Sequence, residues 1–376
     1  MPWQEVSTMS LREEFVMLAS QAGANRRALC RRYGISAKTG YKWLRRYVAQ
    51  GRRGLADHSR RPARSPVRTA SAIEARIIAL REKHPAWGGR KLARRLRDQG
   101  VPEVPAPSTI TTILARHGLL NSVASVQPPY RRFEHPYPNA FWQMDFKGHF
   151  ALTQGRCHPL TVLDDHARFN VTLAACADER GTTVQTRLTH TFRFYGLPER
   201  IGLDNGAPWG QDFVHTLTPL TVWLLHIGVQ IAHSRPYHPQ TLGKDERFHR
   251  SLKAEVIHGH TFGDLADCQQ RFDRWRDVYN LERPHEALGM AVPASRYQPS
   301  PRAFPERLPP IEYEAHDSVR IVQAQGELFY KGHTFRVAKS LRGYRVALRP
   351  TEEDGLWAVY FCHHKVAQIN LRQPCK

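Results

Sequence analysis

The sequence predicts a multidomain chain with N-terminal all-α helix-turn-helix units, a central α/β core in which helices flank a mixed sheet, and a small C-terminal β-barrel. A chain of 376 residues, 41% of them hydrophobic, is too long for one ordinary core and apolar enough to build several. The apolar spacing is helical up to about residue 120 and strand-like from residue 142. Proline-rich stretches separate the central region from both of its neighbours.

The net charge of +21 is concentrated at one end of the chain. Residues 1–135 hold 17 of the excess positive charges, whereas residues 136–376 hold four. A basic region of this kind attracts polyanions, and DNA is the usual one. A general contribution to solubility is the alternative that charge alone leaves open.

Composition also argues against several classes of protein. The sequence contains no apolar run of about 18 residues, so we expect no contact with a membrane. The N-terminus lacks a basic start followed by an apolar stretch, and we therefore expect no secretory signal. The six cysteines form no C-x-x-C pair, which argues against a disulfide scaffold or a zinc finger and favours a cytoplasmic location.

Residues 1–55 are predicted to form a helix-turn-helix DNA-binding domain. Leu11 to Ala22 carries apolar residues at helical spacing, and Asn25 is the expected N-cap of a second helix. Gly34 supplies a turn, after which Ser36 is expected to cap a third helix. Short helices with a glycine turn before a basic third helix are typical of this motif.

The third helix carries the candidate DNA contacts of this domain. Its apolar residues are Tyr41, Leu44 and Val48. Its exposed face is expected to carry four basic residues, Lys38, Lys42, Arg45 and Arg46. A three-helix bundle whose basic surface has no DNA function is the alternative reading of this pattern.

A second helical DNA-binding domain is predicted for residues 71–125, after a basic linker at residues 56–70. Three apolar groups indicate three helices, and Ser108 is expected to cap the last of them. Basic residues surround the middle helix, and the candidates for DNA contact are Arg90, Lys91 and Arg94.

Residues 126–300 are predicted to form the α/β core. Strands are expected at 142–152, 158–164, 168–175, 199–203 and 229–233, and helices at 181–195, 218–226, 243–258 and 264–280. Residues 311–376 contain short strand-like runs separated by glycine turns, which favour a small antiparallel barrel.

Three carboxylates occupy distinctive positions in the core. Asp145 lies in an otherwise apolar strand, where burial of a carboxylate requires a partner. Asp204 follows a short strand, at the end where α/β folds place reactive groups, and Glu246 begins a basic helix. Taken singly, they also fit an edge-strand residue, a turn residue and a first-turn helix acid. Together, on adjacent elements of one sheet, they can hold two divalent ions, Mg²⁺ or Mn²⁺.

Four sequence segments resemble a known family. WQMD at 142–145, LDNG at 203–206 and HPQTLGKDERFHR at 238–250 resemble the three signature blocks of DDE-type insertion-sequence transposases, whose catalytic core is similar to that of retroviral integrases. NLERPHEALGM at 280–290 resembles the segment that follows this core. The resemblance covers about residues 10–300, and the third block is highly specific.

The resemblance implies an RNase H-like integrase core that cleaves transposon ends and transfers the strand with two Mg²⁺ or Mn²⁺ ions. It carries the catalytic and metal-binding roles onto Asp145, Asp204 and Glu246. The 42 positions between Asp204 and Glu246 are more than integrase-type cores usually have, so we expect a longer Pro208–Pro219 loop. Asp245, which adjoins Glu246, is the alternative third ligand.

Further roles are expected around this site. Lys244, Arg247 and Arg250 are candidates for gripping DNA near the active site, with a solvated helix face as the alternative. His238 and Gln240 either shape their loop or touch phosphates. Asp164 and Asp165 are expected to act structurally, by capping or by pairing with Arg168.

The expected partners are double-stranded DNA, both transposon ends and target, and further copies of the chain, because two ends must be cut in register. No small-molecule cofactor is expected. Two other functions remain open from the sequence: a DNA-binding regulator with an inactive core, and an RNase H-like nuclease that cuts without joining.

Overall fold

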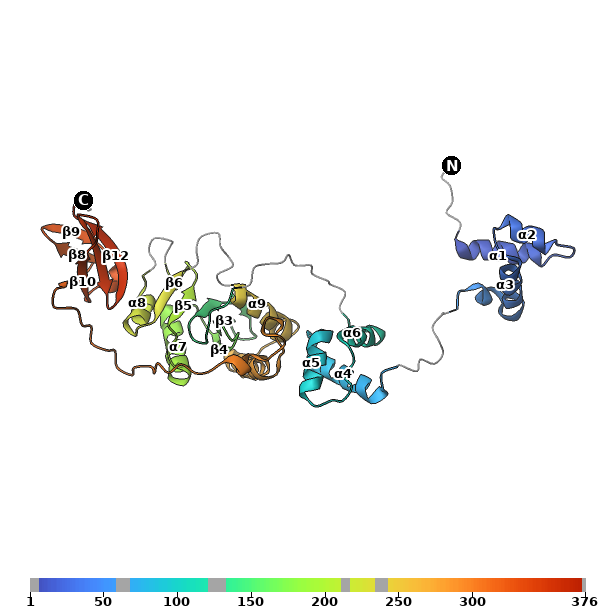
Figure 1. Cartoon of the computed structure of the whole chain (residues 1–376), viewed down its shortest axis with the longest axis horizontal. Coiled ribbons are helices and arrows are strands. Elements are labelled where there is room, and N and C mark those ends of the chain that lie inside the picture. Colours follow the sequence, from blue (N-terminus) through green and yellow to red (C-terminus); the bar gives the residue numbers. More distant parts are fainter. Residues whose placement is uncertain (1–6, 59–67, 121–132, 211–216, 234–242, 374–376) are drawn as a thin grey trace. The chain divides into compact units, whose positions relative to one another are not determined.

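The computed structural model describes residues 7–58, 68–120, 133–210, 217–233 and 243–373. The chain divides into two compact units, Met1–Arg68 and Thr69–Lys376. Figure 1 colours both along the sequence, with the first unit in blue. Among the described residues, no helix is both long and apolar enough to cross a membrane.

The first unit contains three helices, α1 (Thr8–Ala19), α2 (Arg26–Arg32) and α3 (Ala37–Gln50), followed by a 3₁₀ turn at Gly51–Leu55. The two predicted N-caps are confirmed. The Asn25 side chain accepts a hydrogen bond from the Ala28 backbone N–H, and the Ser36 hydroxyl accepts one from the Thr39 N–H. Polar caps therefore set the starts of α2 and α3.

The core of the first unit differs from the apolar pattern expected for α3. Tyr41 and Val48 are exposed, and the buried face of α3 is formed by Gly40, Trp43 and Leu44. The inward stripe includes Gly40 because α3 crosses α1 and α2 closely there. This close crossing brings Trp43 and Leu44 against Phe15 and Cys30 of the same cluster.

Replacing Gly40 by alanine is expected to destabilise this unit. A Cβ at Gly40 would lie 2.4 Å from the Cys30 Sγ and 2.8 Å from the Phe15 Cζ, so the three helices would have to separate. Overpacking of this kind costs about 1–3 kcal/mol, more than the roughly 1 kcal/mol that alanine gains in helix propensity. Hydrogen exchange of the α1–α3 amides, followed by mass spectrometry in the full chain, measures the loss.

The matched control for this variant is Gly181→Ala, also at a helical glycine. There the nearest atom to the added Cβ is the Leu220 Cβ at 3.6 Å, an ordinary contact. Exchange in its helix should be unchanged or slower. Unchanged exchange in the Gly40→Ala chain would show that the three helices accommodate the added methyl group without loss of stability.

The second unit begins with three more helices, α4 (Ser71–Lys83), α5 (Gly89–Asp98) and α6 (Pro107–Arg116), which enclose an apolar cluster around Trp87. The expected cap of α6 is wrong by two residues. Ala106 is the N-cap and Pro107 occupies the first helical turn. Proline favours that position because its fixed φ suits the helix and its missing N–H would have no partner there.

The central sheet is built from six strands. They are β1 (Trp142–Phe146), β2 (Phe150–Ala151), β3 (Arg156–Asp164), β4 (Asn170–Cys176), β5 (Arg200–Leu203) and β6 (Gln230–His233). Their order is β2-β3-β1-β5-β6, with β4 also paired to β3. β3 runs antiparallel to β1 and β4, whereas β1, β5 and β6 are parallel. The predicted mixed sheet is confirmed, and β1 lies inside it.

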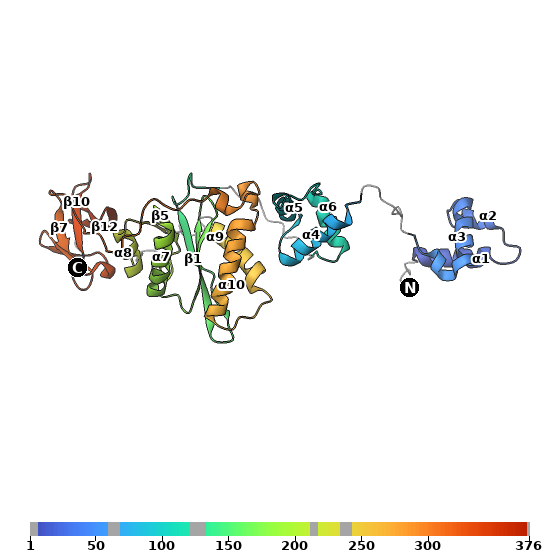
Figure 2. The ribbon, with the colours of Figure 1, turned by 90° about the horizontal axis from the view of Figure 1, so that it is seen from below.

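Helices cover both faces of this sheet. They are α7 (Gly181–Tyr195), α8 (Pro219–His226), α9 (Gly243–Leu252) and α10 (Leu265–Asp277). Figure 2 shows α7 on one side of β1 and α10 on the other. Consecutive strand residues point to opposite faces, so Val162 packs towards α7 while Leu163 packs towards α10.

The two helices on the α10 side end in wider turns. α9 continues as a π-helical turn over Lys253–Ile257, and α10 continues as one over Val278–Glu282. These turns account for the greater length expected from the sequence. Short 3₁₀ turns follow at Glu286–Leu288 and Pro293–Arg296.

The C-terminal region forms two small antiparallel sheets around one core. The larger has the order β12-β11-β10-β7 and the smaller is the hairpin β8-β9. The strands are β7 (Ser318–Ile321), β8 (Glu327–Tyr330), β9 (His333–Arg336), β10 (Arg345–Pro350), β11 (Leu356–Phe361) and β12 (His364–Asn370), with a 3₁₀ turn at Lys339–Leu341. The expected turn glycines Gly326, Gly332, Gly343 and Gly355 all have positive φ.

Helix α8 joins the two cores of this unit. Leu220 and Leu224 belong to the cluster beneath the central sheet, whereas Val222 and Leu225 belong to the cluster of the C-terminal sheets. A helix that is apolar on all sides is one that is covered on all sides. The composition of α8 therefore follows from its position between two apolar clusters.

Candidate active site

Asp145 and Asp204 lie at the same end of two neighbouring strands. The parallel register pairs Trp142 with Ile201 and Gln143 with Gly202, and each aspartate follows two residues later. Gly202 leaves room on β5 for the Phe141 ring, because a Cβ there would lie 2.4 Å from the Phe141 Cζ. Two carboxylates predicted from separate motifs are thus brought together by the sheet.

The environment of Asp145 disfavours its charged form. Burial and, to a smaller extent, the nearby Asp204 carboxylate raise the pKa of the Asp145 carboxyl to about 6. The Phe146 backbone N–H donates to the Asp145 Oδ1 at 2.8 Å, which opposes this rise. A half-buried carboxylate next to an exposed one is a pair that a cation would stabilise.

The inward face of α9 adds Asp245 and His249 to this site. One ligand atom each from Asp145, Asp245 and His249 can be chosen so that all three lie within 4.8 Å of one another. Asp245 is only 1% exposed, and burial together with Asp145 raises its pKa well above the usual value. Burial and Lys147 lower the pKa of His249 to about 3, so its ring is neutral.

The Thr161 hydroxyl lies at the centre of this arrangement. It is 3.0 Å from the Asp145 carbonyl oxygen, 2.9 Å from the Asp245 Oδ2 and 2.7 Å from the His249 Nε2. One hydroxyl proton serves only one of these acceptors at a time. Thr161 therefore ties β3 to both β1 and α9 directly beneath the carboxylates.

Glu246 is not part of this cluster in the described structure. Its side chain is 70% exposed and lies 3.7 Å from Arg250, one turn along α9. Adjacent residues on a helix point about 100° apart, so the inward position of Asp245 turns Glu246 towards solvent. The spacing of Asp245, Phe248 and Leu252, all buried, is the sequence signal for this orientation.

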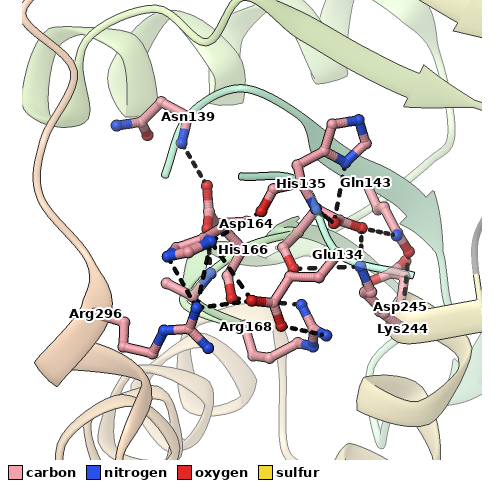
Figure 3. A network of polar contacts seen from close by, with 12 residues as sticks. Glu134, His135, Asn139, Gln143, Asp164, His166, Arg168, Lys244, Asp245 and Arg296 are labelled. Carbon is pink, nitrogen blue, oxygen red and sulfur yellow. Dashed lines mark hydrogen bonds and ion pairs between the residues drawn. The ribbon is translucent and has the colours of Figure 1, made fainter. Parts of the chain in front are cut away.

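A polar network holds the start of α9 against the sheet (Figure 3). Lys244 forms an ion pair with the buried Asp165, which directly follows β3. Gln143 donates its amide to the Asp165 Oδ1 at 2.8 Å and accepts the Asp245 backbone N–H at 3.1 Å. Lys244 was expected to contact DNA, but here its ammonium is engaged within the protein.

The expected structural role of Asp164 is confirmed as capping. Its carboxylate accepts the backbone N–H groups of Asn139 at 2.7 Å and of Ala167 at 2.6 Å. Pairing with Arg168 is wrong, because the Arg168 guanidinium lies 3.2 Å from Glu134 instead. His238 and Gln240, for which a loop or phosphate role was expected, lie outside the described residues.

The candidate DNA contacts on α3 lie on its accessible side. Lys38, Lys42 and Arg45 are exposed, and Arg46 is half-buried. The Lys42 ammonium lies 4.2 Å from the centre of the Trp43 ring, and the Arg46 guanidinium lies 5.2 Å from it. Stacking on this ring holds two cations near one face of the helix.

The remaining candidates for DNA contact lie on α5 and α9, and most of those on α5 are engaged by other charged residues. Arg90 lies 3.6 Å from Glu286, and Arg94 lies 2.8 Å from Asp98. Burial, with a contribution from Arg283, lowers the pKa of Lys91 to about 7. Arg247 and Arg250 are exposed on α9.

Comparison with protein families assigns a description to each region. A helix-turn-helix domain matches residues 11–63 and a homeodomain-like domain matches residues 39–114. Two integrase core domain models match residues 135–239 and 227–293. The C-terminal domain of IS481 family transposases matches residues 317–375.

Two insertion-element proteins are similar in sequence. An uncharacterized 39.2 kDa protein of insertion element IS476 from Xanthomonas euvesicatoria is 27% identical over 251 residues, 64% of this chain and 69% of that protein. An uncharacterized 31.7 kDa protein of IS407 from Burkholderia multivorans is 30% identical over 158 residues, 42% of this chain and 54% of that protein. The second match thus spans about half of that relative.

Among solved structures, the catalytic core domain of HTLV-2 integrase in complex with magnesium aligns with 43% of this chain and 97% of that domain, at 11% identity and a TM-score of 0.32. An integrase core with a cluster of acidic side chains indicates use of a divalent metal. The helix-turn-helix domains indicate binding to DNA.

Proposed function

This chain is an insertion-sequence transposase with an integrase-like core, and we propose from this premise that it cleaves DNA at the ends of its element and joins the freed strand to target DNA. The observation that carries the proposal is the parallel register of β1 and β5, which sets Asp145 beside Asp204 next to the start of α9.

Asp145, Asp204 and Glu246 would hold two divalent ions, Mg²⁺ or Mn²⁺. Their carboxylate oxygens are the hard ligands that these ions prefer, and a bound divalent ion would offset the cost of burying the Asp145 carboxylate. When bound, the ions supply Lewis-acid activation and neutralise charge on the reacting phosphate. Glu246 has a long side chain on the first turn of α9, and its exposure leaves it room to turn inward.

The chemistry needs no covalent link between protein and DNA. A water oxygen forms a bond to phosphorus at the element end, and the 3′ oxygen leaves as a free hydroxyl. That hydroxyl then attacks a target phosphorus and displaces the target's own 3′ oxygen. The role of the carboxylates is to fix these atoms in line, so no serine or tyrosine nucleophile is required.

The basic residues would position DNA around this site. Lys38, Lys42, Arg45 and Arg46 on α3 would select the element end. Arg247 and Arg250 would contact phosphates beside the active site. Arg90, Lys91, Arg94 and Lys244 stay candidates that would first have to exchange their protein contacts for DNA. Since two ends must be cut together, the working form would be a homo-oligomer on DNA.

The test is cleavage of an end-containing duplex by the purified chain. Selection of bound fragments from the DNA flanking its gene would provide the duplex. Nicking is expected with Mg²⁺ or Mn²⁺ and should stop when the metal is chelated. Joining is then assayed with a pre-cleaved end.

Two outcomes would overturn the proposal in different ways. Tight binding without nicking in either metal would indicate a regulator with an inactive core. Metal-dependent nicking with no joining of a pre-cleaved end would indicate a nuclease.

A further inference from the structure

A single buried carboxylate connects the two elements that carry the outer members of the proposed triad. Asp165 lies in the turn after β3 and is 1% exposed. It accepts hydrogen bonds from the Gln143 amide at 2.8 Å and from the His135 backbone N–H at 2.9 Å, and it forms an ion pair with Lys244. Every donor comes from a different segment of the chain.

Two of these donors precede a proposed ligand by the same number of residues in the sequence. Gln143 on β1 precedes Asp145 by two residues, and Lys244 on α9 precedes Glu246 by two residues. Figure 3 shows Gln143 and Lys244 close together beside the start of α9. Asp165 thus lies between the strand and the helix that would each contribute one carboxylate to the proposed site.

Gln143 also provides a hydrogen-bond acceptor for the first turn of α9. The first N–H groups of a helix have no partner within the helix. Gln143 accepts one of them, the Asp245 N–H, at 3.1 Å, while its amide is held by Asp165. The strand that carries Asp145 therefore caps the helix that carries Glu246.

Apolar contacts fix α9 only further along its length. Phe248 and Leu252 pack into the cluster shared with α10, one and two turns after Asp245. At the end of α9 nearest the carboxylates, polar contacts to Gln143, Asp165 and Thr161 take over this role. A rotation of α9 by one residue would turn its side chains by about 100°.

We propose that Asp165 is a positioning residue, which acts with Gln143 and Lys244 to set the rotation of α9 and so the separation of the Asp145 and Glu246 carboxylates. We refer to these three residues as the α9 clamp. The inference rests on the proposed function and adds to it a residue that touches neither DNA nor metal.

The test compares Asp165→Asn, Lys244→Met and the double variant in the full chain. Each single change breaks the same ion pair, so the double variant should be no slower than Asp165→Asn alone. Misplacement of a catalytic group by about 1 Å lowers rates roughly 100-fold, and we expect a fall of about 10- to 100-fold in single-turnover nicking. Lys244→Arg, which keeps a positive charge opposite Asp165, should nick faster than Lys244→Met.

A second measurement separates positioning from general loss of structure. Binding of Mn²⁺ to the DNA-free chain, followed by titration calorimetry, should weaken in Asp165→Asn. In a chain that already carries Glu246→Gln, Asp165→Asn should produce no further weakening, because the carboxylate it positions is absent. Affinity for the end duplex should not change.

The matched control is Glu306→Gln, which removes one carboxylate from an exposed ion pair with Arg193 in the same unit. It should nick at the original rate. The clamp is refuted if folded Asp165→Asn nicks and binds Mn²⁺ as the original chain does, or if its loss lies wholly in DNA affinity. If Asp165→Asn does not fold, Gln143→Met, which removes both the bond to Asp165 and the bond to the Asp245 N–H, is judged by the same two criteria. An original chain that fails to nick refutes the proposed function instead.

Discussion

Asp145→Asn is expected to abolish both nicking and joining while binding of the end duplex persists. Asparagine has the same shape but lacks the charge that would hold a divalent ion, and it still accepts the Phe146 N–H. Removing one member of a group of residues that acts as a unit typically lowers the rate by about 10³-fold or more. Single-turnover nicking and a gel-shift assay on the same duplex measure the two properties.

Asp178→Asn provides the control for this prediction. Asp178 lies in the turn after β4, where its carboxylate accepts from the Thr183 hydroxyl and the Arg180 N–H. The same chemical change there should leave nicking intact. Strand transfer that survives in Asp145→Asn would remove Asp145 from the active site.

The second large effect distinguishes two adjacent residues on α9. Glu246→Gln is expected to lower nicking by about 10³-fold, whereas Asp245→Asn should lower it by about tenfold. The smaller effect is expected because an asparagine at position 245 still accepts from Thr161 and keeps its backbone bond to Gln143. Both variants are measured at saturating Mg²⁺ after their thermal unfolding has been compared.

The reverse order of effects would reassign the third ligand. If Asp245→Asn were the inactive variant and Glu246→Gln the active one, Asp245 would replace Glu246 beside Asp145 and Asp204. His249 would be a further ligand, as its proximity to Asp145 and Asp245 allows. His249→Ala would then also have to lose Mn²⁺ binding. Equal losses in both variants, with unchanged melting, would mean that neither residue alone provides the ligand.

Local chemistry was enough to predict much of the fold. The N-caps Asn25 and Ser36 act on their own first turns, so neighbouring residues determine them. Helix α7 was expected over the range in which it occurs, since Gly181 and Gly196 bound an amphipathic run. Asp145 was predicted because it lies in an otherwise apolar strand, and Asp204 because it directly follows one. Sequence alone displays both patterns.

The orientation of α9 was not predicted, although the spacing of Phe248 and Leu252 carries a signal for it. The motif identifies Glu246, but the side of the helix that faces the sheet depends on Phe248 and Leu252 packing against α10, a contact between distant segments. The partner of Lys244 is invisible in sequence. Asp165 precedes it by 79 residues, and only the sheet brings the two together.

The double-sided burial of α8 has a practical implication for fragments of this protein. Val222 and Leu225 are covered by side chains of the C-terminal sheets, among them Val346 and Phe361. A catalytic domain excised before residue 311 would present these aliphatic groups to water and would tend to aggregate. Val222 and Leu225 would therefore need polar replacements in the isolated domain. Without them, a lack of nicking could reflect aggregation and not a defect in the active site.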